Sequence, residues 1–250
     1  MSAGKVNNEH LTNVAWHMPG KAAYIIPANA VHVWRINISA NLGKLQALSA
    51  TLNAAERLRG GKYVHERDRN RFIVSRGAQR LILGMYLNTR PRLLDFALGE
   101  NKKPYLITDN GKELQYNLSH SGDWILLAVS AREIGSDMEY IDSTFNYHDL
   151  LPEHFSEEES AYVNRQNSAE RFYTLWTRKE ALLKATGQGL GDHLKHTPAL
   201  DGSHIMHTSL SGHTSNWQIK SFSIQDGYMG SIAVEGTLPL LQFWDTDLNY

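Results

Sequence analysis

The segment Ile134–Tyr140 constrains the fold most, because it carries two carboxylates, Asp137 and Glu139, in a pattern typical of a strand. Side chains two residues apart leave a strand on the same face, so both carboxylates would point into one space. Such groups repel each other, and a hard divalent cation such as Mg²⁺, which takes oxygen ligands, would relieve that repulsion. Alternatively, both face solvent on an edge strand, as is common for such pairs. The segment alone leaves these two interpretations open.

A second segment, residues 172–184, predicts a helix, because its apolar residues recur with helical spacing. These apolar positions are Phe172, Leu175, Trp176, Leu182 and Leu183. Glu180 and Lys184 are four residues apart and therefore lie on one side of this helix. Taken alone, the pair indicates a surface ion pair that contributes roughly 0.3–0.5 kcal/mol.

Other segments predict further strands and helices. Val31–Ile38 alternates apolar and polar side chains and predicts a strand, with a slight slip in its register. We expect a short strand at Leu114–Asn117, and the polar run Tyr116–Gly122, taken alone, indicates a tight turn ahead of the strand-like segment Trp124–Val129. Residues 67–87 predict an amphipathic helix. This mixture of elements predicts an α+β (α/β) fold.

Composition limits the class of protein. The chain has 250 residues, enough for one large domain or two small ones. Hydrophobic residues make up 42% and the net charge is −1, so we expect neither nucleic acid nor an anionic membrane as partner. Cysteine is absent, which excludes disulfides and thiolate metal sites and suits a cytoplasmic protein. We find no export signal and no apolar run of about 18 residues, so we expect no membrane insertion.

A polyanionic ligand would therefore need a local basic cluster. The basic side chains between residues 56 and 80 are Arg57, Arg59, Lys62, Arg67, Arg69, Arg71, Arg76 and Arg80. We interpret most of them as a solvated helix face. The polar side of the helix at 67–87 could nevertheless hold an anion, because a guanidinium group presents a planar fork suited to phosphate oxygens.

Several short motifs occur together. They are N-L-S-H-S at 117–121, G-x-D-x-E at 135–139 and W-x-x-K-E-x-x-x-K at 176–184. Four more stretches accompany them: Glu56–Arg59, Lys103–Pro104, Phe155–Glu159 and Gly187–Leu190. Their order and spacing resemble the surfactin-synthetase type of phosphopantetheinyl transferase, over roughly residues 50 to 192. Each motif is weak alone, but the set identifies the family.

The resemblance implies two similar α/β halves related by a pseudo-twofold axis, with the active site at their interface. We accordingly divide the chain at residue 132. Residues 1–132 would bind the 3′-phosphate and adenine of coenzyme A. Residues 133–250 would hold the metal site, the catalytic helix and a C-terminal tail that packs back. No internal repeat is visible in the sequence. The length is similar to that of the family's broad-specificity type, so we expect a monomer.

The resemblance also implies an activity. Such enzymes transfer the 4′-phosphopantetheine arm of coenzyme A to a serine of an acyl, peptidyl or aryl carrier protein and release 3′,5′-ADP. These carriers serve fatty-acid, polyketide and nonribosomal peptide synthesis. The resemblance implies that Asp137, Glu139 and Glu180 hold Mg²⁺. Glu180 would also be the general base for the serine proton, and Lys184 would stabilise charge on the leaving group.

Coenzyme A would be bound from both halves. The side chains that the resemblance assigns to it, directly or through the metal, are Arg59, Lys103, Ser119, His120, Asp137, Lys179 and Lys184. Arg59 and His120 would contact the 3′-phosphate, with Arg57 and Arg71 as further candidates. Lys102 stands where the family usually has glycine. Because glycine often marks a positive φ, we expect the local turn to differ.

Two other functions stay open. A catalytically silent protein could bind coenzyme A or a carrier domain without transfer, and a Mg²⁺-dependent phosphodiesterase could use the same acids to activate water. A carrier protein incubated with coenzyme A and Mg²⁺ would distinguish them. Only the transferase adds mass to the carrier, and only the phosphodiesterase breaks down coenzyme A without an acceptor.

Overall fold

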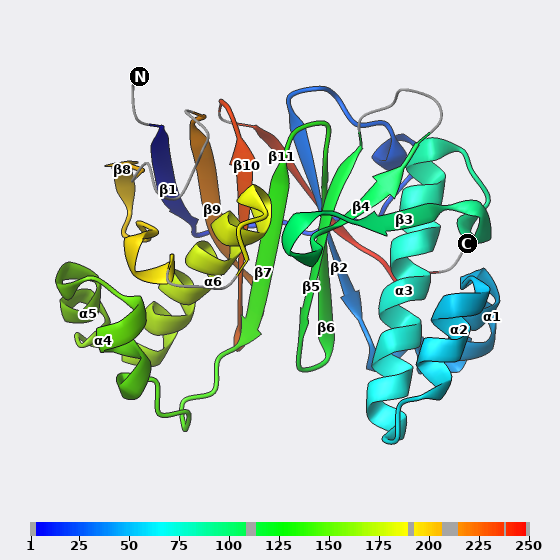
Figure 1. Ribbon diagram of the computed structural model, residues 1–250, viewed down its shortest axis with the longest axis horizontal. Helices are drawn as coiled ribbons and strands as arrows, with labels where there is room; N and C mark the ends of the chain where they lie inside the picture. Colours follow the sequence, from blue (N-terminus) through cyan, green and yellow to red (C-terminus); the bar gives the residue numbers. More distant parts are fainter. Residues whose placement is uncertain (1–3, 109–113, 190–192, 207–214, 238, 249–250) are drawn as a thin grey trace.

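A computed structural model describes residues 4–108, 114–189, 193–206, 215–237 and 239–248. Most of its strands form two sheets that face each other, and a long helix covers the outer face of each sheet (Figure 1). These helices are α3 (Glu66–Leu87) and α6 (Ser168–Thr186), which confirms the helices predicted at 67–87 and 172–184. The predicted mixed α/β fold is likewise confirmed.

The first sheet has five strands, and α6 packs on it. The strands lie in the order β7 (Ile134–Tyr140), β10 (Tyr228–Glu235), β9 (Trp217–Gln225), β1 (Lys5–Leu11), β8 (Gly202–Ile205). β1 runs parallel to β9, whereas the other neighbours are antiparallel. Ala181 and Leu182 of α6 pack against Ile219 and Ala233 of this sheet, which fixes the helix over β7 and its neighbours.

The second sheet has four strands, and α3 packs on it. The strands lie in the order β11 (Leu240–Asp245), β2 (Ala30–Asn37), β6 (Trp124–Ser130), β5 (Gln115–Ser121). Val74 and Ile82 of α3 pack against Trp34 and Ile125 of this sheet. Another apolar layer lies between the two sheets, where Leu126 meets side chains of β7 and β10.

Strand β2 buries both of its faces. Val31 and Val33 pack between the sheets, while Trp34 and Ile36 pack under α3. The predicted slip in register is wrong, because the strand pairs with β6 without interruption from Val31 to Asn37. The apolar residues on both faces reflect two cores, one on each side of the sheet.

The strand expected at Leu114–Asn117 is confirmed from Gln115 onward, and most of the run Tyr116–Gly122, which alone indicates a turn, is strand as well. β5 continues to Ser121, and the turn itself is confined to Gly122 and Asp123. The strand forms because Tyr116 and Leu118 pack in the core beneath α3 while the backbone pairs with β6. Consequently, the N-L-S-H-S motif lies on an extended edge strand whose side chains alternate between two faces.

Shorter elements complete the described chain. β3 (Asp95–Leu98) and β4 (Pro104–Ile107) form a hairpin. The remaining α-helices are α1 (Leu45–Thr51), α2 (Ala54–Gly61), α4 (Leu151–His154) and α5 (Glu157–Val163). The 3₁₀ helices are Lys21–Tyr24, Ser39–Lys44, Pro91–Leu93, Glu100–Lys102, His148–Leu150 and Leu194–His196. In the described part of the chain, we find no helix with the length and apolar character needed to span a membrane.

The first and last strands each join the sheet built mainly by the other part of the chain. β1 pairs with β9 and β8, whereas β11 pairs with β2. The five-stranded sheet therefore draws one strand from before residue 132, and the four-stranded sheet draws one from after it. The division of the chain at residue 132 and the pseudo-twofold axis stay predictions.

Candidate active site

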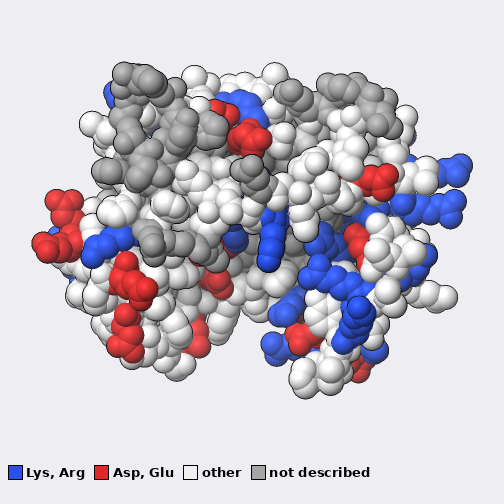
Figure 2. Space-filling model, viewed as in Figure 1, with Lys and Arg blue, Asp and Glu red and all other residues white. Residues whose placement is uncertain are grey.

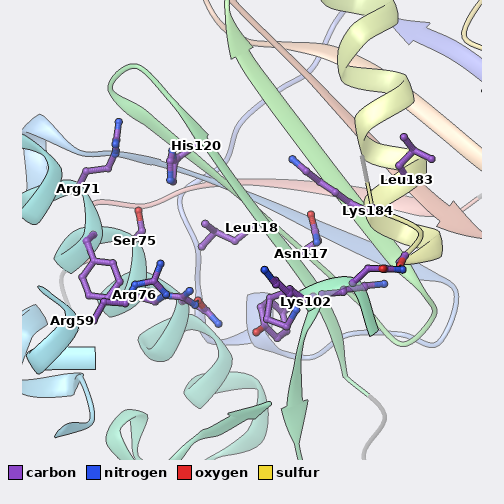
Figure 3. Close-up of a pocket in the computed structure, with 18 of the residues that line it drawn as sticks. Arg59, Arg71, Ser75, Arg76, Lys102, Asn117, Leu118, His120, Leu183 and Lys184 are labelled. Atoms are coloured by element: carbon purple, nitrogen blue, oxygen red, sulfur yellow. The ribbon is translucent and has the colours of Figure 1, made fainter. Parts of the chain in front are cut away.

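A cavity of about 420 Å³ opens between α3, β5 and the C-terminal end of α6 (Figure 3). Its cationic lining residues are Arg59, Arg71, Arg76, Lys102, Lys103 and Lys184. Figure 2 shows Lys and Arg side chains gathered on the side of the molecule that carries α2 and α3, beside a hollow near the middle of this face. The arrangement supplies the local basic cluster that an anionic ligand needs in a chain with a net charge of −1.

The helices α2 and α3 position the arginines of the cavity. Arg71 Nη2 donates to Asp68 Oδ1 at 2.9 Å, and Arg76 Nη1 donates to Gln79 Oε1 at 2.8 Å. Arg59 lies with its guanidinium carbon 5.5 Å from the centre of the Phe72 ring. A guanidinium group has five N–H donors, so each arginine that makes one such bond keeps others for an anion.

The structure separates the three arginines that the resemblance gave as candidates for the 3′-phosphate. Arg59 and Arg71 line the cavity, whereas Arg57 donates to the carbonyl oxygen of Leu52 and is not among the lining residues. Arg76, which we interpreted as part of a solvated helix face, lines the cavity as well. Helical spacing could have identified it, because Arg76 and Arg80 follow Phe72 at i+4 and i+8 on one stripe of α3.

Strand β5 sends Ser119 and His120 to opposite faces. Tyr116, Leu118 and His120 line the cavity. Burial, and then the positive charge of Arg71, lower the pKa of His120, so the ring is neutral near pH 7 and offers one N–H donor. Ser119 is buried, and its Oγ has no hydrogen-bond partner in the described part of the chain. The structure therefore does not bring Ser119 and His120 to one point.

Close packing of β7 and α6 brings the predicted acidic residues together. Gly135 has no side chain, and a Cβ atom there would lie 2.1 Å from the carbonyl oxygen of Ala181 and 2.3 Å from the backbone nitrogen of Ala185. Only glycine allows the helix to approach this closely. As a result, Glu180 and Lys184 lie beside Asp137. The sequence analysis includes Gly135 in a motif but misses its packing role, although a glycine inside a strand is a known sign of close backbone approach.

An ion pair joins the two elements. Lys184 Nζ donates to Asp137 Oδ1 at 2.6 Å and lies 4.0 Å from Glu180 Oε2. Lys184 also lines the cavity, into which its side chain extends from α6 (Figure 3). Although burial lowers the pKa of Lys184, the charges of Asp137 and Glu180 raise it overall, so the ammonium group stays charged. The lysine thus links the buried carboxylates to the cationic cavity.

The carboxylates influence one another. Burial raises the pKa of Glu180 to about 7, with a further contribution from Asp137, while Lys184 acts in the opposite direction. Burial also raises the pKa of Asp137 and of Glu139, and the charge of Asp137 adds to the shift at Glu139. A carboxyl group that titrates near neutral pH can accept a proton from a substrate and later release it.

These carboxylates fit a Mg²⁺ ion that is also held by substrate phosphates. Among the described residues, no three His, Asp or Glu side chains form a complete metal-binding group. Lys184 lies against Asp137, and Glu139 Oε2 accepts a hydrogen bond from Ser121 Oγ at 2.7 Å. However, Asp137 Oδ2 is buried without a partner in the described chain, and Mg²⁺ usually takes only one or two protein carboxylates along with phosphate oxygens and water. The free carboxylate oxygens would therefore be suitable ligands for Mg²⁺.

Lys179 does not belong to this site. Its side chain is fully buried, and Nζ forms an ion pair with Glu159 Oε2 at 2.8 Å and donates to the carbonyl oxygens of Leu194 and Thr197. Consecutive residues on a helix point about 100° apart, so Lys179 turns away from the side that carries Glu180. We correct the expectation that Lys179 binds coenzyme A, because this lysine is buried in an ion pair between α6 and α5 and does not line the cavity.

Lys103 and Lys102 lie at the edge of the cavity. Lys103 lines it, but its Nζ donates to Glu133 Oε2 at 2.7 Å and to the carbonyl oxygen of Ala185 at 2.8 Å, near the end of α6. Lys102 has a φ of +63°, so the backbone keeps the left-handed conformation that glycine adopts freely. The expectation that this turn differs is not supported, and the lysine adds a cation to the cavity wall. The last residue of the Gly187–Leu190 motif, Leu190, lies outside the described residues.

Comparison with known proteins covers most of the chain. The family model described as "4'-phosphopantetheinyl transferase superfamily" matches residues 133–233, and one described as "4'-phosphopantetheinyl transferase, N-terminal" matches residues 38–132. The chain is 36% identical over 170 residues to "4'-phosphopantetheinyl transferase HetI" of Nostoc, an alignment that spans 65% of this chain and 71% of that protein. It is 32% identical to a putative 4'-phosphopantetheinyl transferase of Synechocystis, over 69% and 72% of the two chains. A 4'-phosphopantetheinyl transferase of Bacillus subtilis is 28% identical, over 59% and 66%.

Proposed function

Because this chain belongs to the 4′-phosphopantetheinyl transferase superfamily and is an enzyme of that class, we propose that it transfers phosphopantetheine from coenzyme A to carrier proteins with the help of Mg²⁺. The other product of the reaction would be 3′,5′-ADP. The observation that best supports the proposal is the position of Lys184, which lines the cationic cavity and also binds the buried carboxylate of Asp137. A phosphate bound by Lys184 in the cavity would therefore lie close to the carboxylate of Asp137.

The cavity suits a ligand with several phosphates. Arg59 and Arg71 would bind the 3′-phosphate of coenzyme A together with neutral His120, since forked guanidinium donors and an imidazole N–H all match phosphate oxygens. Arg76 and Lys102 would add positive charge along the walls. Lys103 would add positive charge at the same wall, and its hydrogen bond to the carbonyl oxygen of Ala185 would hold the end of α6.

In this proposal, the chemistry forms one P–O bond and breaks another. The serine oxygen of the carrier attacks the phosphorus that bears the pantetheine arm, and the bond to 3′,5′-ADP breaks. Glu180 accepts the serine proton, directly or through a water molecule. Lys184 neutralises charge on the departing phosphate. When bound by Asp137, Glu139 and Glu180, Mg²⁺ would supply charge neutralisation at the pyrophosphate.

The proposal is tested by mass spectrometry of carrier proteins. Apo carriers of the fatty-acid, polyketide and peptidyl types are incubated with the enzyme, coenzyme A and Mg²⁺, and parallel reactions contain a chelator. We expect the mass of at least one carrier to rise by one phosphopantetheine group, only when Mg²⁺ is present. A reaction with 3′-dephospho-coenzyme A is expected to be slower, because this substrate lacks the 3′-phosphate that the cationic wall of the cavity would bind.

The same experiment distinguishes the other functions. Breakdown of coenzyme A without a carrier would indicate a phosphodiesterase, and binding of coenzyme A with no change in any carrier would indicate a silent binding protein. Transfer that persists in the chelator would contradict the proposed role of Mg²⁺.

We expect the affinity of the protein for Mg²⁺ to rise with pH up to about 7. The pKa of Glu180 is raised to about 7, so a large fraction of this carboxyl carries a proton at lower pH. That proton must leave before the oxygen can bind a metal, and the association constant should fall by up to about tenfold per pH unit below 7. Calorimetric titration with Mg²⁺ between pH 6 and pH 8 measures this dependence. The Glu180→Gln variant should bind more weakly with a flatter profile, and an equally steep profile in that variant would assign the proton to another group.

A further inference from the structure

The edge strands β5 and β7 lie side by side although they belong to different sheets (Figure 1). Side chains of β5 bridge to the backbone of β7 at two points. Asn117 Oδ1 accepts a hydrogen bond from the backbone N–H of Ser136 at 2.9 Å. Four residues further along β5, Ser121 Oγ accepts one from the backbone N–H of Tyr140 at 3.1 Å. These two contacts fix β7 against β5 at either end of the acidic segment.

The contacts of Ser121 settle the direction of its hydrogen bonds. A hydroxyl group has one proton and can accept at its lone pairs, whereas a backbone N–H can only donate. Since Ser121 Oγ accepts from Tyr140, its own proton is free to point to Glu139 Oε2, which lies 2.7 Å away. A hydrogen bond of this length to a carboxylate is charge-assisted and strong.

This contact restrains a side chain that would otherwise have considerable freedom. Glu139 is only partly buried and has three rotatable side-chain bonds. Ser121 fixes one of its two carboxylate oxygens, and the rigid strand pair beneath fixes Ser121. Glu139 is thereby held on the same face of β7 as Asp137, close enough for the two charges to interact.

We propose that Ser121 is a positioning residue, which orients the Glu139 carboxylate beside Asp137 so that the pair can hold Mg²⁺. This inference rests on the proposed function, in which both carboxylates surround the metal. Groups that hydrogen-bond to metal ligands typically strengthen metal binding 10- to 100-fold. The Ser121 hydroxyl therefore affects the affinity for Mg²⁺, whereas Glu180 and Lys184 act on the reacting atoms.

The test compares Ser121→Ala with the wild-type enzyme. We expect the dissociation constant for Mg²⁺, measured by calorimetry on the protein alone, to rise about tenfold. The Mg²⁺ concentration for half-maximal transfer should rise by the same factor, while kcat at saturating Mg²⁺ stays within about twofold of wild type. Ser121→Thr keeps the hydroxyl group and should restore wild-type metal affinity.

A matched control is Ser39→Ala. Ser39 Oγ donates to Asp123 Oδ1 at 2.8 Å and thus anchors the turn that follows β5, but it does not touch Glu139. Its Mg²⁺ affinity should equal that of wild type. If both alanine variants weaken Mg²⁺ binding equally, the effect comes from anchoring the turn and the role of Ser121 is overturned.

A double-mutant cycle separates a specific effect from a general loss of structure. Because Ser121 is proposed to act through Glu139, Ser121→Ala should have no further effect on Mg²⁺ affinity in a Glu139→Gln background. An undiminished effect in that background would overturn the proposal, whether or not the single variant melts at a lower temperature. Wild-type transfer without any divalent cation would overturn the magnesium requirement itself, and this role of Ser121 with it. A magnesium-dependent wild type with an unchanged Ser121→Ala variant would overturn only the role of Ser121.

Discussion

Replacing Asp137 with asparagine is expected to reduce kcat/KM for carrier modification about 10³-fold, as for the loss of one preorganised electrostatic contact in an active site. The substitution keeps the shape of the side chain and removes its charge. Lys184 would lose its charged partner, which lies 2.6 Å away in the wild type. Asp137 Oδ2, which is buried without a partner among the described residues, would no longer offer negative charge to a cation. Asp137 would therefore hold neither the Lys184 ammonium group nor the Mg²⁺ ion in position as firmly.

Steady-state transfer to an apo carrier measures this effect, and thermal melting checks the fold. The fold should survive, because Lys184 is a third exposed and its charge can be solvated when Asp137 is neutral. Asp142→Asn is a matched control just beyond β7. Asp142 is partly exposed and caps a turn through Thr144, a task that asparagine also performs, so this variant should keep its activity. If Asp137→Asn transferred at a rate near that of wild type, the site would be assigned to the wrong residues.

The second large effect is expected from Gly135→Ala. The added Cβ atom would meet two backbone atoms of α6, at 2.1 Å and 2.3 Å, and backbone cannot move aside as the end of a flexible side chain can. We expect α6 to shift away from β7, at a cost of about 3 kcal/mol in the free energy of unfolding. For a chain of this length, that corresponds to a fall in Tm of about 6–12 °C. Because the shift also moves Glu180 and Lys184 from Asp137, kcat/KM should fall about 10²-fold even where the protein is folded.

Thermal melting and transfer rates at a temperature well below Tm test the two parts separately. Gly61→Ala serves as the control, since a Cβ atom at Gly61, in helix α2, would have no atom within 4 Å. That variant should match wild type in activity and should not lose stability, because alanine favours a helix more than glycine does. Wild-type Tm and activity in Gly135→Ala would mean that β7 and α6 can separate without harm.

Much of the site could be predicted from two periodicities. The two-residue repeat of a strand places Asp137 and Glu139 on one face of β7, and the i, i+4 spacing of a helix places Glu180 and Lys184 on one side of α6. The structure brings these two faces together. Their roles in metal binding and proton transfer stay predictions. Periodicity was sufficient here because both elements are long, regular and buried on their opposite faces.

Other features depend on contacts that no local pattern contains. Lys179 follows the motif of the family, yet whether it faces the cavity or the core is decided by Glu159, which lies twenty residues earlier in the chain. Likewise, N-L-S-H-S looks like a turn in isolation and becomes a strand because β6 pairs with it. The β1–β9 and β2–β11 pairings each join residues more than 200 positions apart in the chain, so the places of β1 and β11 follow only from the complete topology.

The crossed placement of these two end strands has a consequence for biosynthesis. A nascent chain that has left the ribosome only as far as residue 132 lacks β11, so the sheet beneath α3 is still missing its edge. β1 must also wait for β9 before it can pair. The five-stranded sheet can be completed only after residue 235 has left the ribosome, and the four-stranded sheet only after residue 245.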